Sequence, residues 1–556
     1  MCKLPFPRWA CLLLAGAAVM QGTEPMAPPR LAVVIAIDQF RYDYLDRFGE
    51  VLPADGFRRL REQGTDFRDC HYRHAYTKTA PGHAVILSGA HPSVHGIVGN
   101  EWVSREGWQS VVGVEDRQSP LVGAPPRALH SPGGVLEAKE GRSPRNFEAE
   151  TVGDVLKAQT GGKAKVVSVA NKDRSAILLG GHRADGAYWY ERGNFVTSRY
   201  YREQLPTWVD DFNRAGRVPA YFGRTWDRLL DPAVYERLAG PDDAAGEDPS
   251  PGLGRTFPRR VDGGRPEFGN AFLSAFPITP FYSEILAEFA QVAVKAEGLG
   301  RDDVTDLLCV GFSQIDHTGH SFGPDSQEVM DSILRLDRLV AGLLACLDAE
   351  VGAGRYVVVV TADHGVAPLP ERVAATQPGV GGRLDPVAVT RAVEQALDAA
   401  FGPPPAPLYW VTRDGTGFHL RPETLAAKQL AAPAAWAVVK AALQARPEVL
   451  AAYTRGDLEA AGPADELREK LRRSYRRDRS PDVAYILRPH WVDRAKNGTN
   501  HGTPHPYDSH VPLIWFGPGI PAAVRTERVG VDDLAPTLSA LLGLPRPPQA
   551  TGTALF

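Results

Sequence analysis

The sequence predicts an α/β protein built on a central, mainly parallel sheet, with a smaller domain inserted into it. Three observations support this fold class. Several apolar runs lack polar alternation, which is typical of strands that helices cover on both faces. Amphipathic helical patterns lie between these runs, and such alternation favours a parallel sheet. One stretch, residues 375–490, departs from the alternation.

Five apolar runs are the predicted strands of this sheet. The first, "RLAVVIAID", ends on an acid, and the others follow a similar pattern; they occupy residues 30–38, 163–170, 306–316, 355–365 and 510–519. Between the third and the fourth, residues 326–350 carry apolar side chains at three- and four-residue spacing, which predicts a helix. We therefore assign the core of the protein to residues 30–374 and 491–556.

Two regions break the pattern. Residues 238–268 are rich in Gly, Pro and Asp, and we expect an exposed loop there. Residues 375–490 contain two amphipathic helices, a predicted strand "PLYWVT" and a basic stretch at 467–480. We interpret them as an inserted, cap-like domain. The basic stretch favours a solvated helix face over an anion-binding site.

Composition excludes some classes of partner. The chain has 556 residues, 43% of them hydrophobic and 23% charged, which is enough for a substantial core. Its formal net charge is -4, from 62 basic and 66 acidic residues. This balance creates no overall field suited to nucleic acid, so we expect no nucleic acid as a specific partner. We also expect a monomer.

Residues 1–22 are a predicted secretory signal peptide. Lys3 and Arg8 precede an apolar run from Trp9 to Met20, which is short of the ~20 residues that span a bilayer. We expect a secreted, periplasmic protein without a stable membrane anchor; a retained anchor is the alternative. Three cysteines follow this leader and permit at most one disulfide: Cys70, Cys309 and Cys346.

Three predicted strands run directly into side chains that bind metal ions. Asp38 ends the first strand, Asp316 the third, and Asp363 with His364 the fourth. Ligands bind beyond the carboxyl ends of parallel strands, so we expect these side chains to converge. A single Asp–His pair is more often a salt bridge than a metal site. The prediction therefore depends on the whole set.

Two more histidines complete the predicted ligands. His320 follows Asp316 by four residues, so one helical turn places both on the same side. His501 precedes a glycine that permits close approach, and we prefer it to His505 and His510, which we interpret as surface histidines or neighbours of ligands. The six ligands suit two ions with three protein ligands each, and mixed His and carboxylate ligation favours zinc. Paired ions clamp the attacking and leaving oxygens of phosphoryl transfer.

The motif "TKTAPGH", residues 77–83, supplies the reactive group. A hydroxyl at a helix N-terminus lies beside free backbone amides, a site suited to phosphate, and zinc lowers the pKa of a hydroxyl that it binds. A helix cap is the alternative for one of the two threonines. Lys78, between them, is expected to face away.

Taken in order, these motifs resemble the alkaline phosphatase superfamily. A strand-terminal Asp is followed by "KTAPGH", "HGIVGNEW", "DHTGHSFGP", "TADHG" and "NHG". The resemblance covers residues 30–365 and 497–545. It is closest to the threonine-nucleophile, two-zinc alkaline phosphatases related to type I phosphodiesterase/nucleotide pyrophosphatases. It implies a three-layer sandwich and two Zn²⁺ per chain.

The resemblance also implies a role for each matching residue. Thr79 matches the nucleophile, which forms a phosphothreonine, and Thr77 is then a capping or structural hydroxyl. Asn100 matches a residue that hydrogen-bonds a phosphate oxygen; a loop turn is its alternative. The metal ligands implied are Asp316, His320 and His501 for one zinc, and Asp38, Asp363, His364 and Thr79 for the other.

Lys172 and Arg174 favour a monoester as the substrate. They follow the strand at 163–170 two residues apart, so an extended chain would point them the same way. Two cations suit a dianionic phosphoryl group. The resemblance agrees, because its monoesterase branch carries a Lys-x-Arg pair here. A solvated pair at a strand end is the alternative.

These inferences lead to one expected function and two rivals. We expect an exported alkaline phosphatase that hydrolyses phosphate monoesters through a phosphothreonine at a two-zinc site. A phosphodiesterase or nucleotide pyrophosphatase of the same superfamily is the first rival. A catalytically inactive metal-binding protein is the second.

Overall fold

The computed structural model describes residues 1–2, 28–125, 140–249, 252–463 and 465–556. The predicted signal peptide lies outside the described residues, apart from its first two positions. Within the described part of the chain, none of the helices is both long and apolar enough to cross a bilayer.

The centre of the molecule is an 11-stranded sheet with the order β21-β2-β20-β13-β1-β12-β7-β8-β9-β5-β6. Five neighbouring strands in its middle are parallel. Their residues are almost all buried, which explains the continuous apolar runs in the sequence. The predicted α/β fold with a mainly parallel core is therefore confirmed. The parallel strands are β13 (Tyr356–Thr361), β1 (Leu31–Ile37), β12 (Asp306–Phe312), β7 (Val166–Ala170) and β8 (Gly186–Glu191).

The outer strands depart from this direction. Strand β20 (Leu513–Phe516), predicted from its apolar run as a further parallel strand, is antiparallel to both of its neighbours, β13 and β2 (Thr65–His71). Direction was predicted wrongly here because a doubly covered strand has the same apolar pattern in either direction. The remaining strands are β21 (Ala523–Gly530), β9 (Asn194–Ser198), β5 (Glu115–Val122) and β6 (Gly141–Arg142).

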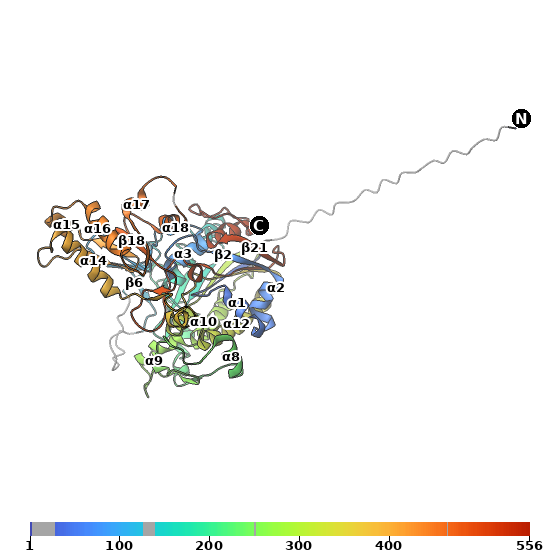
Figure 1. The fold of residues 1–556 in the computed structure, drawn as a ribbon. Helices are drawn as coiled ribbons and strands as arrows, with labels where there is room; N and C mark the ends of the chain where they lie inside the picture. Colours follow the sequence, from blue (N-terminus) through green and yellow to red (C-terminus); the bar gives the residue numbers. More distant parts are fainter. Residues whose placement is uncertain (3–27, 126–139, 250–251, 464) are drawn as a thin grey trace.

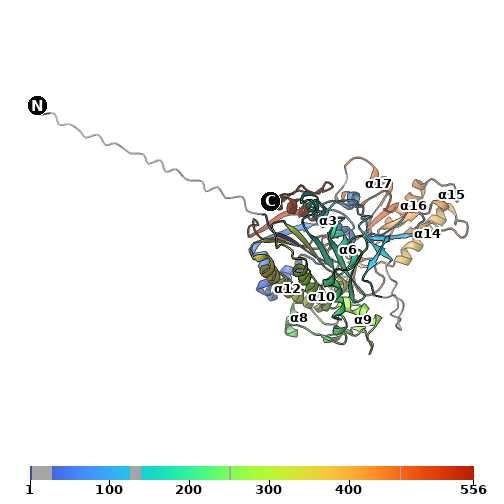
Figure 2. The same cartoon turned by 180° about the vertical axis from the view of Figure 1, so that it is seen from behind.

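Helices cover both faces of the sheet, which makes three layers (Figure 2). Along β8, Ala187 and Trp189 pack with helices α3 (Thr79–Ser88) and α6 (Asp173–Gly180). The alternate residues Tyr188 and Tyr190 contact Phe289 and Tyr282 of α10 (Phe281–Glu297), and α10 packs on α12 (Gln327–Leu347). Successive side chains of a strand point to opposite faces, so the two helix pairs lie on opposite sides. Helix α12 matches the helix predicted at 326–350.

A second, smaller sheet has its own core. Its order is β15-β16-β18-β17, and helices α14 (Pro386–Phe401) and α16 (Ala432–Gln444) pack on it. Figure 1 shows both helices together at one end of the molecule, away from α8 and α12. The strands are β15 (Val411–Arg413), β16 (Gly417–Leu420), β18 (Val483–Leu487) and β17 (Val449–Thr454).

The described residues of 238–268 form mainly an exposed loop, as predicted, but the stretch is not exposed throughout. It follows α8 (Pro232–Ala239) and contains Arg259, whose side chain is 0% exposed and pairs with the equally buried Glu328 of α12. Burial raises the pKa of Glu328 even though Arg259 acts in the opposite direction. The Gly- and Pro-rich composition indicates the backbone turns of this segment, but it does not indicate that Arg259 is buried.

We expect Arg259→Met to lower the free energy of unfolding by about 3–5 kcal/mol, because it leaves a buried carboxylate without its partner. Urea denaturation measures this effect. The double variant Arg259→Met/Glu328→Leu should recover most of the loss. Arg260→Met is a matched control, since the neighbouring arginine is 68% exposed and should contribute less than about 1 kcal/mol. Equal losses for Arg259 and Arg260 would contradict the buried pair.

Candidate active site

The site lies at the carboxyl ends of three neighbouring strands. Strand β1 pairs with β12 on one side and β13 on the other, and the three end almost level: Ile37 faces Phe312, and Ala36 faces Thr361. Asp38 follows β1 directly. Asp316 lies on α11 (Gln314–Phe322), which follows β12 after a single residue.

Six predicted ligands form two groups of three. In each group the ligand atoms lie within 4.8 Å of one another. His501 reaches its group from the loop before α19 (Pro506–Ser509), which no sequence spacing indicates. We name these the Asp38 group, made of Asp38, Asp363 and His364, and the Asp316 group, made of Asp316, His320 and His501.

Backbone carbonyls orient the three histidines. The Nδ1 of His320 is 2.9 Å from the carbonyl of Thr499, and the Nδ1 of His501 is 2.8 Å from that of Thr77. In the same way, the Nδ1 of His364 is 2.9 Å from a carbonyl. A carbonyl only accepts, so each Nδ1 carries the proton and each Nε2 keeps a lone pair for a metal.

The donor atoms of the Asp38 group fit a cation. Asp38 Oδ1 and Asp363 Oδ2 are buried and accept no well-aligned hydrogen bond from the described residues. His83 Nδ1 lies 3.2 Å from Asp363 Oδ2 but is directed to the carbonyl of Thr79 at 2.9 Å, and His364 Nε2 lies 3.4 Å from each of the two oxygens. Two buried carboxylate oxygens beside a lone pair are unfavourable without a positive charge between them. A metal ion that accepts mixed oxygen and nitrogen ligands meets this need.

Lys172 connects the two groups. Its Nζ lies 2.6 Å from Asp38 Oδ2 and 2.6 Å from Asp316 Oδ2. Burial opposes the charge of this lysine, but the two carboxylates outweigh it and raise the pKa of Lys172. Burial likewise opposes the charge of Asp316, yet Lys172 and His320 hold the pKa of Asp316 well below its usual value. The ammonium of Lys172 and the carboxylate of Asp316 are therefore both charged in the folded protein.

Arg174 lies differently from the prediction. Lys172 is the N-cap residue of α6, so Arg174 falls in the first helical turn and the two side chains are not on one extended segment. The guanidinium of Arg174 lies 3.7 Å from Asp173. Its charge still acts on Lys172, whose pKa it lowers. The pair thus contributes positive charge together, but only Lys172 contacts the ligands directly.

Thr79 is the first residue of α3 and is 1% exposed. Its Oγ1 lies 3.4 Å from His364 Nε2, beside the Asp38 group. Gly82 sets this approach, because a Cβ there would lie 2.2 Å from the carbonyl oxygen of Asp363. Asn100 lies at the same helix end, where its Oδ1 accepts a hydrogen bond from the backbone N–H of Ala80 at 2.8 Å. Within the part of the chain that the structure describes, the amide nitrogen of Asn100 donates to no other group.

Thr77 has a structural contact and does not cap the helix. Its hydroxyl donates to the carbonyl of Thr503 at 2.8 Å, while its own carbonyl orients His501. Helix α3 has no side-chain cap. The two threonines of "TKTAPGH" therefore have different surroundings, and only Thr79 faces the metal ligands.

Gln39 is a site residue that no sequence pattern indicated. Its backbone N–H donates to Asp363 Oδ1 at 3.1 Å, and its side chain donates to Asp316 Oδ1 at 2.7 Å. It therefore contacts one ligand of each group. Its φ of 64° is in the left-handed region, which costs energy for a residue with a side chain. Gly319 makes room for it, since a Cβ there would lie 1.9 Å from Gln39 Oε1.

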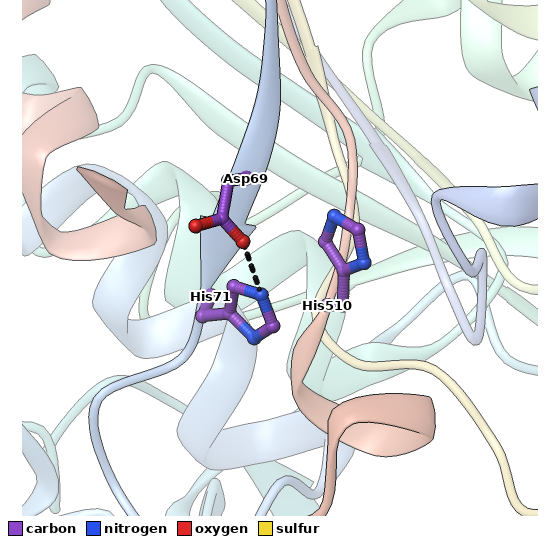
Figure 3. Close-up of side chains that lie close together, drawn as sticks. All are labelled: Asp69, His71 and His510. Atoms are coloured by element: carbon purple, nitrogen blue, oxygen red, sulfur yellow. Dashed lines mark hydrogen bonds and ion pairs between the residues drawn. The ribbon is translucent and has the colours of Figure 1, made fainter. Parts of the chain in front are cut away.

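A third cluster, Asp69, His71 and His510, has a different character (Figure 3). The two histidine rings are stacked, with centroids 4.5 Å apart and planes 10° apart. Ring lone pairs lie in the ring planes, so two parallel rings cannot both aim at one ion. Arg528 also binds Asp69, at 3.0 Å. We interpret this cluster as an ion-pair network that joins β2 to β21.

Comparisons with known proteins agree with this site. The family described as type I phosphodiesterase / nucleotide pyrophosphatase matches residues 32–508. The chain belongs to this family. Alkaline phosphatase PhoV of Synechococcus elongatus is 34% identical over 96% of this chain and 93% of its own. A protein of Myroides odoratus named calcium-transporting ATPase is 32% identical over 96% of this chain and 95% of its own.

A solved structure extends the likeness to the fold. The crystal structure of alkaline phosphatase PafA superposes with a TM-score of 0.88 and 30% identity, covering 96% of this chain and 99% of that one. PafA of Elizabethkingia meningoseptica is 31% identical over 97% of this chain. The alkaline-phosphatase-like architecture expected from the motifs is thus confirmed.

Asp363 should make the metal-free protein less stable as the pH rises from about 4 to about 7, relative to a variant that lacks this carboxylate. Burial and the charge of Asp38 raise the pKa of Asp363 to about 7, whereas an unfolded aspartate titrates near ~4. The folded state therefore binds more protons in this interval, and its contribution to the free energy of unfolding falls as they are lost. Urea denaturation of chelator-treated protein across this range measures the slope.

Asp363→Asn should remove this contribution to the pH dependence of the free energy of unfolding. Saturation with metal should remove it too, because the ion takes the place of the proton on Asp363. Asp303→Asn serves as the control, since Asp303 is 93% exposed. A slope that is identical in wild type and Asp363→Asn would contradict the assignment.

Proposed function

We propose that this protein is an alkaline phosphatase that hydrolyses phosphate monoesters through a phosphothreonine on Thr79. The observation that carries the proposal is the position of Thr79 at a helix N-terminus, 3.4 Å from His364, beside two groups of metal ligands. The family membership and the alkaline phosphatases among its relatives support it.

We propose two Zn²⁺ as the metal cofactors. The Asp316 group would hold one ion; the Asp38 group, with the Thr79 hydroxyl, would hold the other. The donor set of carboxylates and Nε2 atoms suits zinc, although manganese or iron accept similar ligands. When bound, such ions neutralise the buried carboxylates and stabilise negative charge on the attacking and leaving oxygens.

In the reaction proposed here, the oxygen of Thr79 forms a bond to phosphorus while the bond to the leaving oxygen breaks. Water then attacks the phosphothreonine, which releases inorganic phosphate and restores the hydroxyl. Asn100, Lys172 and Arg174 would bind the non-bridging oxygens, and the free amides of α3 add partial positive charge. Once metals neutralise Asp38 and Asp316, the ammonium of Lys172 becomes available to phosphate.

A diesterase is the second candidate, because the family takes its description from phosphodiesterases and pyrophosphatases. The buried Lys172 favours the monoester, since a dianionic phosphoryl group has one more charge to pair with it. The inactive metal-binding protein is the third. It explains the ligands but assigns no role to the hydroxyl of Thr79.

Three further features belong to the proposal. We infer that the chain is exported to the periplasm after removal of the leader at residues 1–22, and that it acts as a monomer. We also infer that residues 375–490 form an inserted cap beside the site. The hydroxyl of Tyr76, near Thr79 in the sequence, donates to the backbone carbonyl of Thr416 at 2.9 Å, and this contact supports the proposed position of the insertion.

Thr79→Ala should reduce hydrolysis of phenyl phosphate by roughly a thousandfold or more while zinc content stays unchanged. Steady-state kinetics and elemental analysis measure the two quantities. Thr77→Val is the matched control within the same motif and should keep activity within about tenfold, because only its hydrogen bond to Thr503 is lost. Wild type without any turnover would support the inactive binding protein instead.

Lys172→Ala and Arg174→Ala should lower kcat/KM for phenyl phosphate far more than for methyl phenyl phosphate, by roughly tenfold or more, because the diester has one charge fewer. Lys163→Ala, which removes an exposed lysine, should leave both substrates unaffected. A wild-type preference for the diester, or equal losses on both substrates with metal retained, would contradict the monoesterase.

A further inference from the structure

A small cavity of about 50 Å³ adjoins the metal ligands, and the reaction proposed above involves only His501 among its lining residues. On one side it is lined by Lys78, His501 and Gly502 of the core. On the other it is lined by Tyr485 and Trp491, which lie in and just after the inserted stretch. His501 therefore faces both this cavity and the Asp316 group.

Lys78 extends along the floor of this cavity. A Cβ on Gly502, whose φ is 107°, would lie 3.2 Å from Lys78 Cε and 3.5 Å from its Cγ. A Cβ on Gly415 would lie 3.5 Å from the ammonium nitrogen. The side chain thus crosses the backbone next to His501 and ends at the turn between β15 and β16. The expectation that Lys78 faces away from the site is wrong.

The ammonium of Lys78 has no partner among the described residues. Two carboxylates are near its end of the cavity, and both are engaged. Asp493 pairs with Arg413, and Asp414 lies 2.7 Å from His419 and accepts from Thr416. A half-buried ammonium that makes no ion pair with these acids, one of which is already paired with an arginine, favours an anion beside it.

The position of the cavity indicates which part of a substrate would reach it. Thr79 lies beside His364 of the Asp38 group. In an in-line displacement the leaving oxygen departs on the side opposite the attacking one. The leaving group is therefore directed toward the Asp316 group, and His501 of that group lines the cavity that holds Lys78.

We propose that Lys78 binds an anionic group, a carboxylate or a second phosphate, on the leaving group of the phosphate monoester. The inference rests on the proposed monoesterase function and deepens it, because it names the substrate class as monoesters with a second negative charge. Tyr485 and Trp491 would contact the apolar part of such a leaving group from the inserted stretch.

Paired substrates test this role. We compare kcat/KM for phenyl phosphate with that for 3- and 4-carboxyphenyl phosphate and for phenylene bisphosphate, in wild type and in Lys78→Met, which keeps the aliphatic chain and removes the charge. For at least one anionic ester, the ratio of anionic to neutral ester should fall roughly fivefold or more in Lys78→Met. Lys78→Arg, which keeps the positive charge, should retain most of the wild-type ratio. Comparing ratios between variants cancels the intrinsic reactivity of each ester.

The control is Lys163→Met, which removes the same charge from an exposed position and should leave every ratio at the wild-type value. Metal content and the retained turnover of phenyl phosphate report that the variants are folded. If Lys78→Met slows all esters equally, Lys78 only packs against Gly502 and the subsite is overturned. If wild type hydrolyses none of the esters, the proposed function fails and the subsite with it.

Discussion

The burial of three neighbouring carboxylates with too little positive charge between them is the constraint on which this site depends. Asp38, Asp316 and Asp363 follow neighbouring strands at one edge of the sheet, where water cannot separate their charges. One lysine, Lys172, lies between two of them. Among the described residues, Asp363 has no such cation beside it, and burial together with the charge of Asp38 raises its pKa. The fold places these side chains together at a cost that bound cations offset, which is a physical reason to regard the site as a metal centre.

The surrounding backbone holds this arrangement in place. Carbonyls select the tautomer of each histidine, and Gly82 lets α3 approach the chain at Asp363. Gln39 spans both groups of ligands in a left-handed conformation. Backbone strain of this kind persists only where the surrounding contacts hold the residue in place, and it is frequent at functional sites. The contacts of the chain itself thus hold the ligands in these positions.

The inserted stretch and the core meet next to this centre. The core supplies all six ligands, the nucleophile and the cations proposed for phosphate. The inserted stretch supplies aromatic side chains such as Tyr485 beside Lys78. In the function proposed here, this division would separate chemistry from substrate selection: the strand ends would carry out the reaction, and the neighbouring surface would select the leaving group. Relatives could then share the same chemistry while differing in substrate.

The sequence alone determined the parallel core, the helix that joins Asp316 to His320, and which of the two threonines lies beside the metal ligands, because these depend on local periodicity, short spacing and ordered motifs. It could not determine the direction of β20, since burial on both faces leaves no directional pattern. Nor could it place Lys78, Gln39 or the buried Arg259, whose surroundings come from distant segments. Only the tertiary structure decided those contacts, because side chains far apart in the chain have no spacing that records their approach.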